Sequence, residues 1–168
     1  MNTGDQKSVS RRAAVLGAAA FAAGLAALTQ RADAADTDDA YNKLLDRYSA
    51  AVNAHDTSTF PEIFTDAYVQ HSGRSPSGLQ AQIANFQRIF DNWPDFQSRF
   101  EDRIFSADKI VARTTFSGTH AKAVLGFAPT GKKVSWGAID IWRVENGKLA
   151  EHWDMVDVAG LQKQLRGE

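Results

Sequence analysis

The chain has 168 residues, of which 43% are hydrophobic and 23% charged, and its formal net charge at pH 7 is −1. This length fits one globular domain, and a chain without a basic excess is not expected to bind nucleic acid. The absence of cysteine excludes disulfide bonds, thiolate metal sites and a cysteine nucleophile.

The first 34 residues have the pattern of an export signal. Arg11 and Arg12 precede an uncharged, alanine-rich run at residues 13–28, and Ala32-Asp33-Ala34 follows shortly after it. The run is 16 residues long, whereas a membrane-spanning helix needs about 20. We therefore expect a twin-arginine-type signal that is cleaved after Ala34, with an uncleaved anchor as the alternative.

Cleavage predicts a single mature domain over residues 35–168 that is periplasmic or extracellular. It would meet the membrane only transiently, through the export signal. A chain without thiols also suits an oxidising compartment.

Hydrophobic periodicity predicts helices in the first half of the mature domain. Apolar residues recur at helical spacing from Asp38 to Val52, and Asp38 or Asp39 could accept the free N–H groups at the start of this helix. A short helix with proline in its first turn, a short strand and a third helix should follow, over residues 57–64, 67–71 and 79–93.

After residue 93 the hydrophobic residues recur at every second position, which predicts strands. Candidates rich in Phe, Val, Ile, Thr and Trp cover residues 96–105, 109–120, 132–144 and 148–157. The tail, residues 158–166, returns to helical spacing. Helices first and an antiparallel sheet second predict an α+β domain.

The turn of the last hairpin decides which side chains share a face. A two-residue Asn146-Gly147 turn without a bulge would place Ile139 and Ile141 beside Asp154 and His152. A three-residue turn that includes Glu145, with Gly147 left-handed in a bulge, would place Asp140 opposite His152 and Ala138 opposite Asp154.

Several segments of the chain resemble one known family. They are Phe116-Ser117-Gly118-Thr119-His120, Gly126 to Lys132, Ala138 to Val144, Gly147 to Asp154 and the closing Val156 to Leu165. Over about residues 38–166 the chain resembles the SnoaL-like polyketide cyclases, also called ester cyclases, of the nuclear transport factor two-like superfamily. This resemblance implies a cone-shaped α+β roll, with about three N-terminal helices packed into a strongly curved, mostly antiparallel sheet.

The resemblance also implies site residues. The aspartate of the His-Trp-Asp motif, Asp154, would act as acid or base in the cavity, and His152 and Asp140 would line the same cavity. Only the bulged register puts all three on one face, so we expect that register. The alternative for Asp154 is a strand carboxylate paired with a nearby Lys or Arg.

Burial in an apolar cavity raises the pKa of a carboxyl group in general, so that it can take and return a proton. We therefore expect proton abstraction beside a carbonyl, with His152, His120, His71 or a protonated Asp140 as hydrogen-bond donor to the oxyanion. Other pocket-lining candidates are Trp136, Ala138, Trp142, Tyr48, Phe86 and Phe90, although core packing explains the tryptophans equally well.

The sequence thus favours an acid/base enzyme of cyclase, isomerase or hydrolase type acting on a small apolar carbonyl or ester compound. A non-catalytic protein that binds a small hydrophobic molecule, and a scaffold whose sheet serves dimerisation, are the alternatives. The scattered histidines predict no metal site, and the lack of a glycine-rich phosphate loop or nucleophile elbow predicts no cofactor. A homodimer through the outer sheet face is an expectation from the superfamily.

Overall fold

A computed structural model describes residues 35–168, so the predicted export signal lies outside the described residues. Residues 40–168 form one compact unit. Within the described part of the chain, no helix combines the length and apolar character that a membrane crossing requires. The first helix already includes residue 35 and runs to residue 53. Asp38 and Asp39 therefore lie inside it, and the expectation that either begins the helix is wrong.

The remaining elements follow the predicted order. They are α2 (Phe60–Ile63), β1 (Phe64–Gln70), α3 (Leu79–Asn92), β2 (Gln97–Ser106), β3 (Lys109–Thr119), β4 (Lys133–Glu145), β5 (Lys148–Val156) and α4 (Val158–Arg166). The second helix is shorter than predicted, because the chain turns extended at Phe64 and starts β1 there. Pro61 occupies its first turn, where a missing N–H leaves no helical bond unmade.

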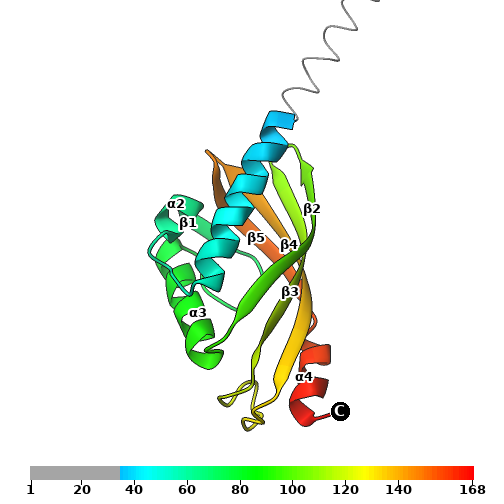
Figure 1. Cartoon of the computed structure of the whole chain (residues 1–168). Coiled ribbons are helices and arrows are strands. Elements are labelled where there is room, and N and C mark those ends of the chain that lie inside the picture. Colours follow the sequence, from blue (N-terminus) through cyan, green and yellow to red (C-terminus); the bar gives the residue numbers. More distant parts are fainter. Residues whose placement is uncertain (1–34) are drawn as a thin grey trace, which may run out of the picture. The chain divides into compact units, whose positions relative to one another are not determined.

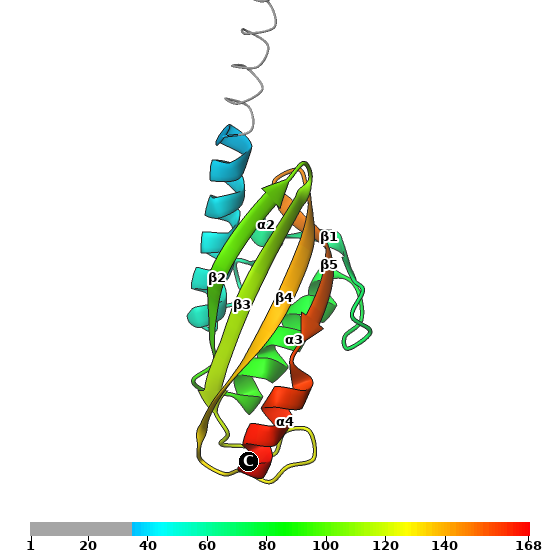
Figure 2. The same cartoon turned by 90° about the vertical axis from the view of Figure 1, so that its right-hand side faces the viewer.

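The five strands form one sheet in the order β1-β5-β4-β3-β2. The strands β2 to β5 pair antiparallel, whereas β1 runs parallel to β5. Figures 1 and 2 show the long strands curving past residues 40–53 of the first helix and past α3, which lie together on one side of the sheet. The α+β class and the curved, mostly antiparallel sheet are confirmed.

The core lies between these helices and the inward face of the sheet. Alternation along β4 points Ala138, Asp140 and Trp142 inward. Large side chains from every layer are fully buried there, among them Leu44, Leu45, Phe60, Phe64, Tyr68, Trp142 and Leu149. Burial of this apolar surface supplies the main driving force for the fold.

The hairpin between β4 and β5 closes with the tighter turn. Glu145 pairs with Lys148, and Asn146 and Gly147 between them both have positive φ, 51° and 73°. Asn-Gly suits this geometry, because its twist matches that of the flanking strands. The predicted three-residue turn is therefore wrong.

A β-bulge nevertheless turns the acidic side chains inward. The register shifts between Arg143 and Val144, and Ala150 is the extra residue on β5. Leu149 and Ala150 are consecutive, and both are buried, as expected when a bulge interrupts strict alternation.

Beyond the bulge, Asp140 pairs with Asp154 and Trp142 pairs with His152. The predicted pairs, Asp140 with His152 and Ala138 with Asp154, are thus wrong by two positions. A shift of two positions preserves the face on which a side chain lies. Asp140, His152 and Asp154 therefore share one face as expected, for a different reason.

Candidate active site

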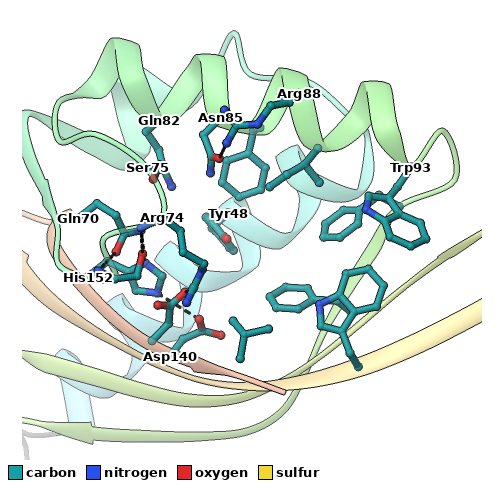
Figure 3. Close-up of a pocket in the computed structure, with 18 residues that line it drawn as sticks. Tyr48, Gln70, Arg74, Ser75, Gln82, Asn85, Arg88, Trp93, Asp140 and His152 are labelled. Carbon is teal, nitrogen blue, oxygen red and sulfur yellow. Dashed lines mark hydrogen bonds and ion pairs between the residues drawn. The ribbon is translucent and has the colours of Figure 1, made fainter. Parts of the chain in front are cut away.

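A cavity of about 380 Å³ lies between α3 and the inward face of the sheet. Its wall divides into an aromatic end and a polar end, with Tyr48 from the first helix between them (Figure 3). We use "aromatic end" for Trp93, Phe96, Phe116 and Trp136. We use "polar end" for Gln70, Arg74, Gln82, Asp140, His152 and Asp154.

The aromatic end is a set of rings in mutual contact. The ring centroids of Trp93 and Trp136 are 5.0 Å apart, and those of Phe116 and Trp136 are 5.9 Å apart. Trp93 also lies against Gly118 on β3, where a Cβ atom would come within 3.0 Å of its Cε3. A glycine at this position lets the Trp93 side chain approach the strand closely. The aromatic end therefore offers a wall suited to a planar apolar group.

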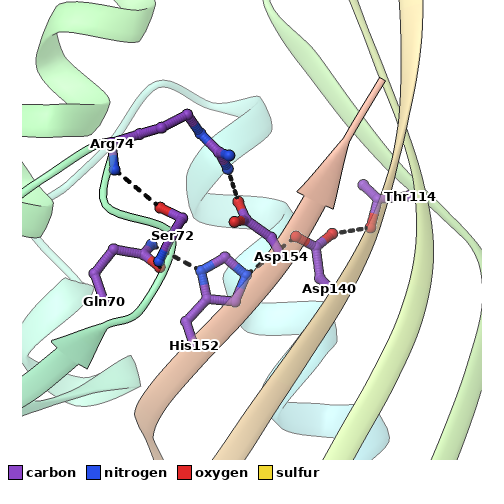
Figure 4. Close-up of polar contacts among 7 residues, drawn as sticks. All are labelled: Gln70, Ser72, Arg74, Thr114, Asp140, His152 and Asp154. Carbon is purple, nitrogen blue, oxygen red and sulfur yellow. Dashed lines mark hydrogen bonds and ion pairs between the residues drawn. The ribbon is translucent and has the colours of Figure 1, made fainter. Parts of the chain in front are cut away.

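Asp140 accepts two hydrogen bonds at the polar end of the cavity. Thr114 Oγ1 donates to Asp140 Oδ2 at 2.5 Å, and His152 Nε2 donates to Asp140 Oδ1 at 3.1 Å (Figure 4). Asp140 is 3% exposed and Thr114 is 1% exposed. Both carboxylate oxygens thus have partners, as a buried charge requires.

The imidazole of His152 is held on three sides. Its ring stacks on Trp142, with centroids 5.0 Å apart and an interplanar angle of 8°. Its Nδ1 lies 2.9 Å from Gln70 Nε2, and its Nε2 contacts Asp140. Gln70 can reach it because β1 pairs with β5 at this point, Gln70 beside His152.

Asp154 has one paired oxygen and one without a partner. The guanidinium of Arg74, which comes from the loop after β1, donates to Asp154 Oδ2. Asp154 Oδ1 is buried and has no hydrogen-bond partner among the described residues, and the Asp154 side chain is 9% exposed. A buried acceptor without a partner is uncommon and costly. Asp154 lines the cavity, and this oxygen keeps an unused acceptor position.

Tyr48 remains a hydroxyl donor in this setting. Its burial, and then the negative charges of Asp140 and Asp154, raise the pKa of the Tyr48 phenol above its ordinary value. Both causes disfavour the phenolate. The Tyr48 hydroxyl therefore stays protonated and can donate a hydrogen bond to an oxygen in the cavity.

Six of the predicted site residues meet in this cavity. The lining includes the three predicted catalytic residues and three of the predicted pocket residues, namely Asp140, His152, Asp154, Tyr48, Phe86 and Trp136. Trp142 is not in the lining, because it lies behind the ring of His152, where it is 2% exposed.

Two predicted donors point elsewhere. His71 stacks on Trp153, with centroids 4.4 Å apart, and donates to Glu151 Oε2 at 2.8 Å. Trp153 neighbours Asp154 and has the opposite orientation on β5, so His71 is outside the cavity lining. His120 is fully buried, and its Nδ1 contacts Thr130 Oγ1 at 3.1 Å. Neither histidine lines the cavity, so these two predictions are wrong.

Ala138 and Phe90 are also outside the lining. Ala138 is buried and pairs across the strands with Val156, which itself lines the cavity. Phe90 stacks on His55, with centroids 4.3 Å apart. Both residues therefore serve packing.

Sequence reasoning missed polar residues that line the cavity, above all Gln70, Arg74 and Gln82. For two of them, the position in the sequence indicates an inward-facing side chain. Gln70 is two residues beyond the buried Tyr68 on β1, and alternation puts it on the same inward face. Gln82 lies within the apolar stripe of α3, four residues before Phe86. Arg74 lies in a loop, and nothing in its local sequence indicates that it contacts Asp154.

Asp140, His152 and Asp154 are also a group that could hold a cation, because one donor atom from each lies within 4.8 Å of the others. These atoms already have other partners. His152 Nε2 and Asp140 Oδ1 contact each other, and Arg74 supplies the positive charge beside Asp154. The donor set thus fits internal pairing better than a metal ion.

The fold and the site together define an α+β protein with a ligand-sized cavity that has a carboxylate at one end. A family model described as SnoaL-like polyketide cyclase matches residues 42–165. The chain belongs to this family. No curated protein is significantly similar to it.

Solved structures share the fold. TsrD from Streptomyces laurentii is 31% identical, with a TM-score of 0.71 over 76% of this chain and 95% of that one. AclR from Streptomyces galilaeus is 25% identical, with a TM-score of 0.67 over 76% and 81% of the two chains. A SnoaL-like polyketide cyclase from Agrobacterium tumefaciens is 21% identical, with a TM-score of 0.67 over 74% and 96%, which supports the fold alone.

Proposed function

We propose that the protein is a cofactor-free acid/base enzyme that abstracts a proton beside the carbonyl of a small apolar ketone or ester. Asp154 is the base. The observation that carries this proposal is that Asp154 lines the cavity while its buried Oδ1 has no hydrogen-bond partner among residues 35–168. Membership of a cyclase family supports reaction at a carbonyl compound.

In this mechanism the substrate's apolar body lies against the aromatic end, and its carbonyl lies near Tyr48 and Arg74. Asp154 Oδ1 takes a proton from the carbon next to the carbonyl, and the C–H electron pair forms the enolate. The Tyr48 hydroxyl and the Arg74 guanidinium donate to the enolate oxygen, where negative charge develops. Asp154 then returns the proton to the same or another atom, which completes an isomerisation or prepares a ring closure.

The roles of the predicted catalytic residues differ in this proposal. Asp140 accepts hydrogen bonds at both oxygens, and both nitrogens of His152 have partners. Each therefore supports the site, whereas Asp154 exchanges the proton. Non-catalytic binding of a small hydrophobic molecule in the same cavity is the outcome if no proton transfer occurs.

Hydrogen–deuterium exchange tests the proposal directly. The probe is 2-acetylnaphthalene in D₂O, an apolar aryl methyl ketone, and ¹H NMR follows the loss of its methyl protons. The wild-type protein should accelerate exchange, and Asp154→Asn should lower the catalysed rate by about 10²- to 10⁴-fold, which is the range for a general base. Thermal shift with the same ketone measures binding separately.

The matched control is Asp66→Asn, an exposed aspartate on β1 outside the cavity lining. It should exchange the ketone protons at the wild-type rate. Equal exchange by wild type and Asp154→Asn contradicts the proposed base. Binding without exchange in the wild type supports the binding protein instead.

We also propose a homodimer through the outer face of the sheet. Ile139 pairs with Met155 across β4 and β5, and their side chains are 43% and 75% exposed. Ile104 on β2 is 62% exposed. Sedimentation of wild type and Met155→Asp measures this, and a wild-type monomer at micromolar concentration contradicts it.

Export completes the proposal. Arg11 and Arg12 before the alanine-rich run support delivery by a twin-arginine route to the periplasm or the medium. Replacing both arginines by lysine should retain the full-length chain inside the cell. Wild-type protein that stays in the cytoplasm with its N-terminus intact contradicts this.

A further inference from the structure

A directional chain of hydrogen bonds reaches the cavity from the loop after β1. Its first member is the backbone N–H of Ser72, which donates to Gln70 Oε1 at 3.1 Å. A backbone amide can only donate, so its partner must be the oxygen of the Gln70 side chain. This contact identifies which end of the Gln70 amide carries the oxygen.

The other end of the same amide fixes the protonation of His152. Gln70 Nε2 lies 2.9 Å from His152 Nδ1, and an amide nitrogen only donates. Nδ1 must therefore accept and carries no proton. The ring proton is on Nε2, which donates to Asp140 Oδ1 at 3.1 Å.

The surroundings prevent the ring from turning to another arrangement. The His152 side chain is 10% exposed, and Trp142 stacks on the ring with an interplanar angle of 8°. Asp140 cannot offer a free oxygen, because Thr114 donates to Oδ2. The chain from Ser72 to Thr114 thus has one consistent set of donors and acceptors (Figure 4).

We infer that Gln70 is a positioning residue that holds His152 as the neutral Nε2–H tautomer, with both ring nitrogens occupied. A second proton would place Nδ1–H against the amide N–H₂ of Gln70, donor against donor. This inference rests on the proposed function in one respect: it leaves proton exchange with the substrate to Asp154.

Other charged groups around His152 favour its charged form, so the Gln70 contact opposes them. One carboxylate oxygen of Asp140 on β4 and one of Asp154 on β5 lie within 4.8 Å of one ring nitrogen of His152. Arg74 from the loop pairs with Asp154, and Tyr48 from the first helix stays neutral. Two nearby carboxylates stabilise an imidazolium, and an amide N–H₂ at Nδ1 acts against it.

Gln70 also anchors the loop that carries Arg74. Its backbone N–H donates to Ser77 Oγ at 3.1 Å, while its side chain accepts from Ser72 N–H. Arg74 lies between these two serines. The same residue therefore sets the protonation of His152 and fixes both ends of the loop that pairs with Asp154.

Imidazole ¹⁵N NMR of the full chain tests the inference without any substrate. His152 is assigned by the loss of its signals in His152→Asn. At pH 7 the wild-type ring should show one protonated nitrogen, Nε2, and an unprotonated Nδ1. Gln70→Glu replaces the donor by an acceptor of the same shape, so a second N–H signal, at Nδ1, should appear at the same pH.

The matched control is Gln82→Glu. Gln82 lines the same cavity, and among residues 35–168 no hydrogen bond joins it to His152, so this variant should leave the wild-type pattern unchanged. The signals of His55, His71 and His120 report whether each variant is folded. A wild-type ring with a proton on Nδ1, or a Gln70→Glu ring that still lacks one, overturns the inference.

These results are separable from the exchange assay. Failure of ketone exchange with a wild-type Nε2–H tautomer removes the proposed reaction and leaves the role of Gln70 intact. The reverse result, exchange by Asp154 with a doubly protonated His152, removes the role of Gln70 alone.

Discussion

Replacing Thr114 by valine removes one hydroxyl from beneath the candidate active site and changes little else in shape. The hydroxyl donates to Asp140 Oδ2 at 2.5 Å, and the two side chains are 1% and 3% exposed. Water therefore cannot replace the lost donor. A hydrogen bond to a charged group contributes about 1.5–3 kcal/mol, so Thr114→Val should lower the free energy of unfolding by about 2 kcal/mol. For a domain of this size that corresponds to a fall in Tm of about 8 °C.

Urea denaturation of five proteins measures this: the wild type, Thr114→Val, Thr114→Ser, Asp140→Asn and the double variant of Thr114→Val with Asp140→Asn. Thr114→Ser keeps the hydroxyl and loses a methyl group, and it should cost less than Thr114→Val, about 1 kcal/mol. In an Asp140→Asn background the acceptor is neutral, so the valine replacement should also cost only about 1 kcal/mol. Equal costs of Thr114→Val in both backgrounds, or a serine variant as unstable as the valine variant, would refute the reasoning.

Two further predictions concern packing and pH. Gly118→Ala should cost about 1–3 kcal/mol of unfolding free energy in urea titrations, because its Cβ would lie 3.0 Å from Trp93. Gly137→Ala, whose Cβ would meet its nearest atom at 3.9 Å, is the control, and equal losses would contradict the overpacking. Hydrogen bonds from the backbone and hydroxyl of Thr119 hold the pKa of Asp95 below its ordinary value. The wild type should therefore exceed Asp95→Asn in stability above about pH 4, and this advantage should vanish as the pH falls through the lowered pKa; an advantage that does not change with pH would argue against it.

The elements could be predicted because local sequence determines them. The stripe from Leu79 to Phe86 and the proline after Trp93 define α3, and the tail from Val158 to Arg166 forms α4 where helical spacing predicts it. The family resemblance assigns Asp140, His152 and Asp154 to one face. The predicted register is wrong by two positions, and a shift of two positions leaves each side chain on the same face.

The rest depends on contacts that are distant in the chain. The bulge at Ala150 follows a turn whose sequence gives no sign of an extra residue. Arg74 is 80 residues from Asp154, and the length of its loop does not show where its side chain points. His71 directly follows β1, which pairs with β5. Its ring stacks on Trp153, on the face of the sheet opposite to Asp154. Register and loop conformation therefore limited the prediction.

The bulge on β5 has a consequence for how this hairpin tolerates changes in length. Leu149 already pairs with Val144, and Glu151 with Arg143, so Ala150 is surplus to the pairing. Deleting Ala150 would leave a regular hairpin in which His152 and Asp154 keep their partners and their orientation. Deleting one residue beyond the bulge would reverse the orientation of every side chain that follows it. One short strand thus contains a position where a single-residue deletion preserves the orientation of the side chains that follow, beside positions where the same deletion would turn His152 and Asp154, or Asp154 alone, away from the cavity.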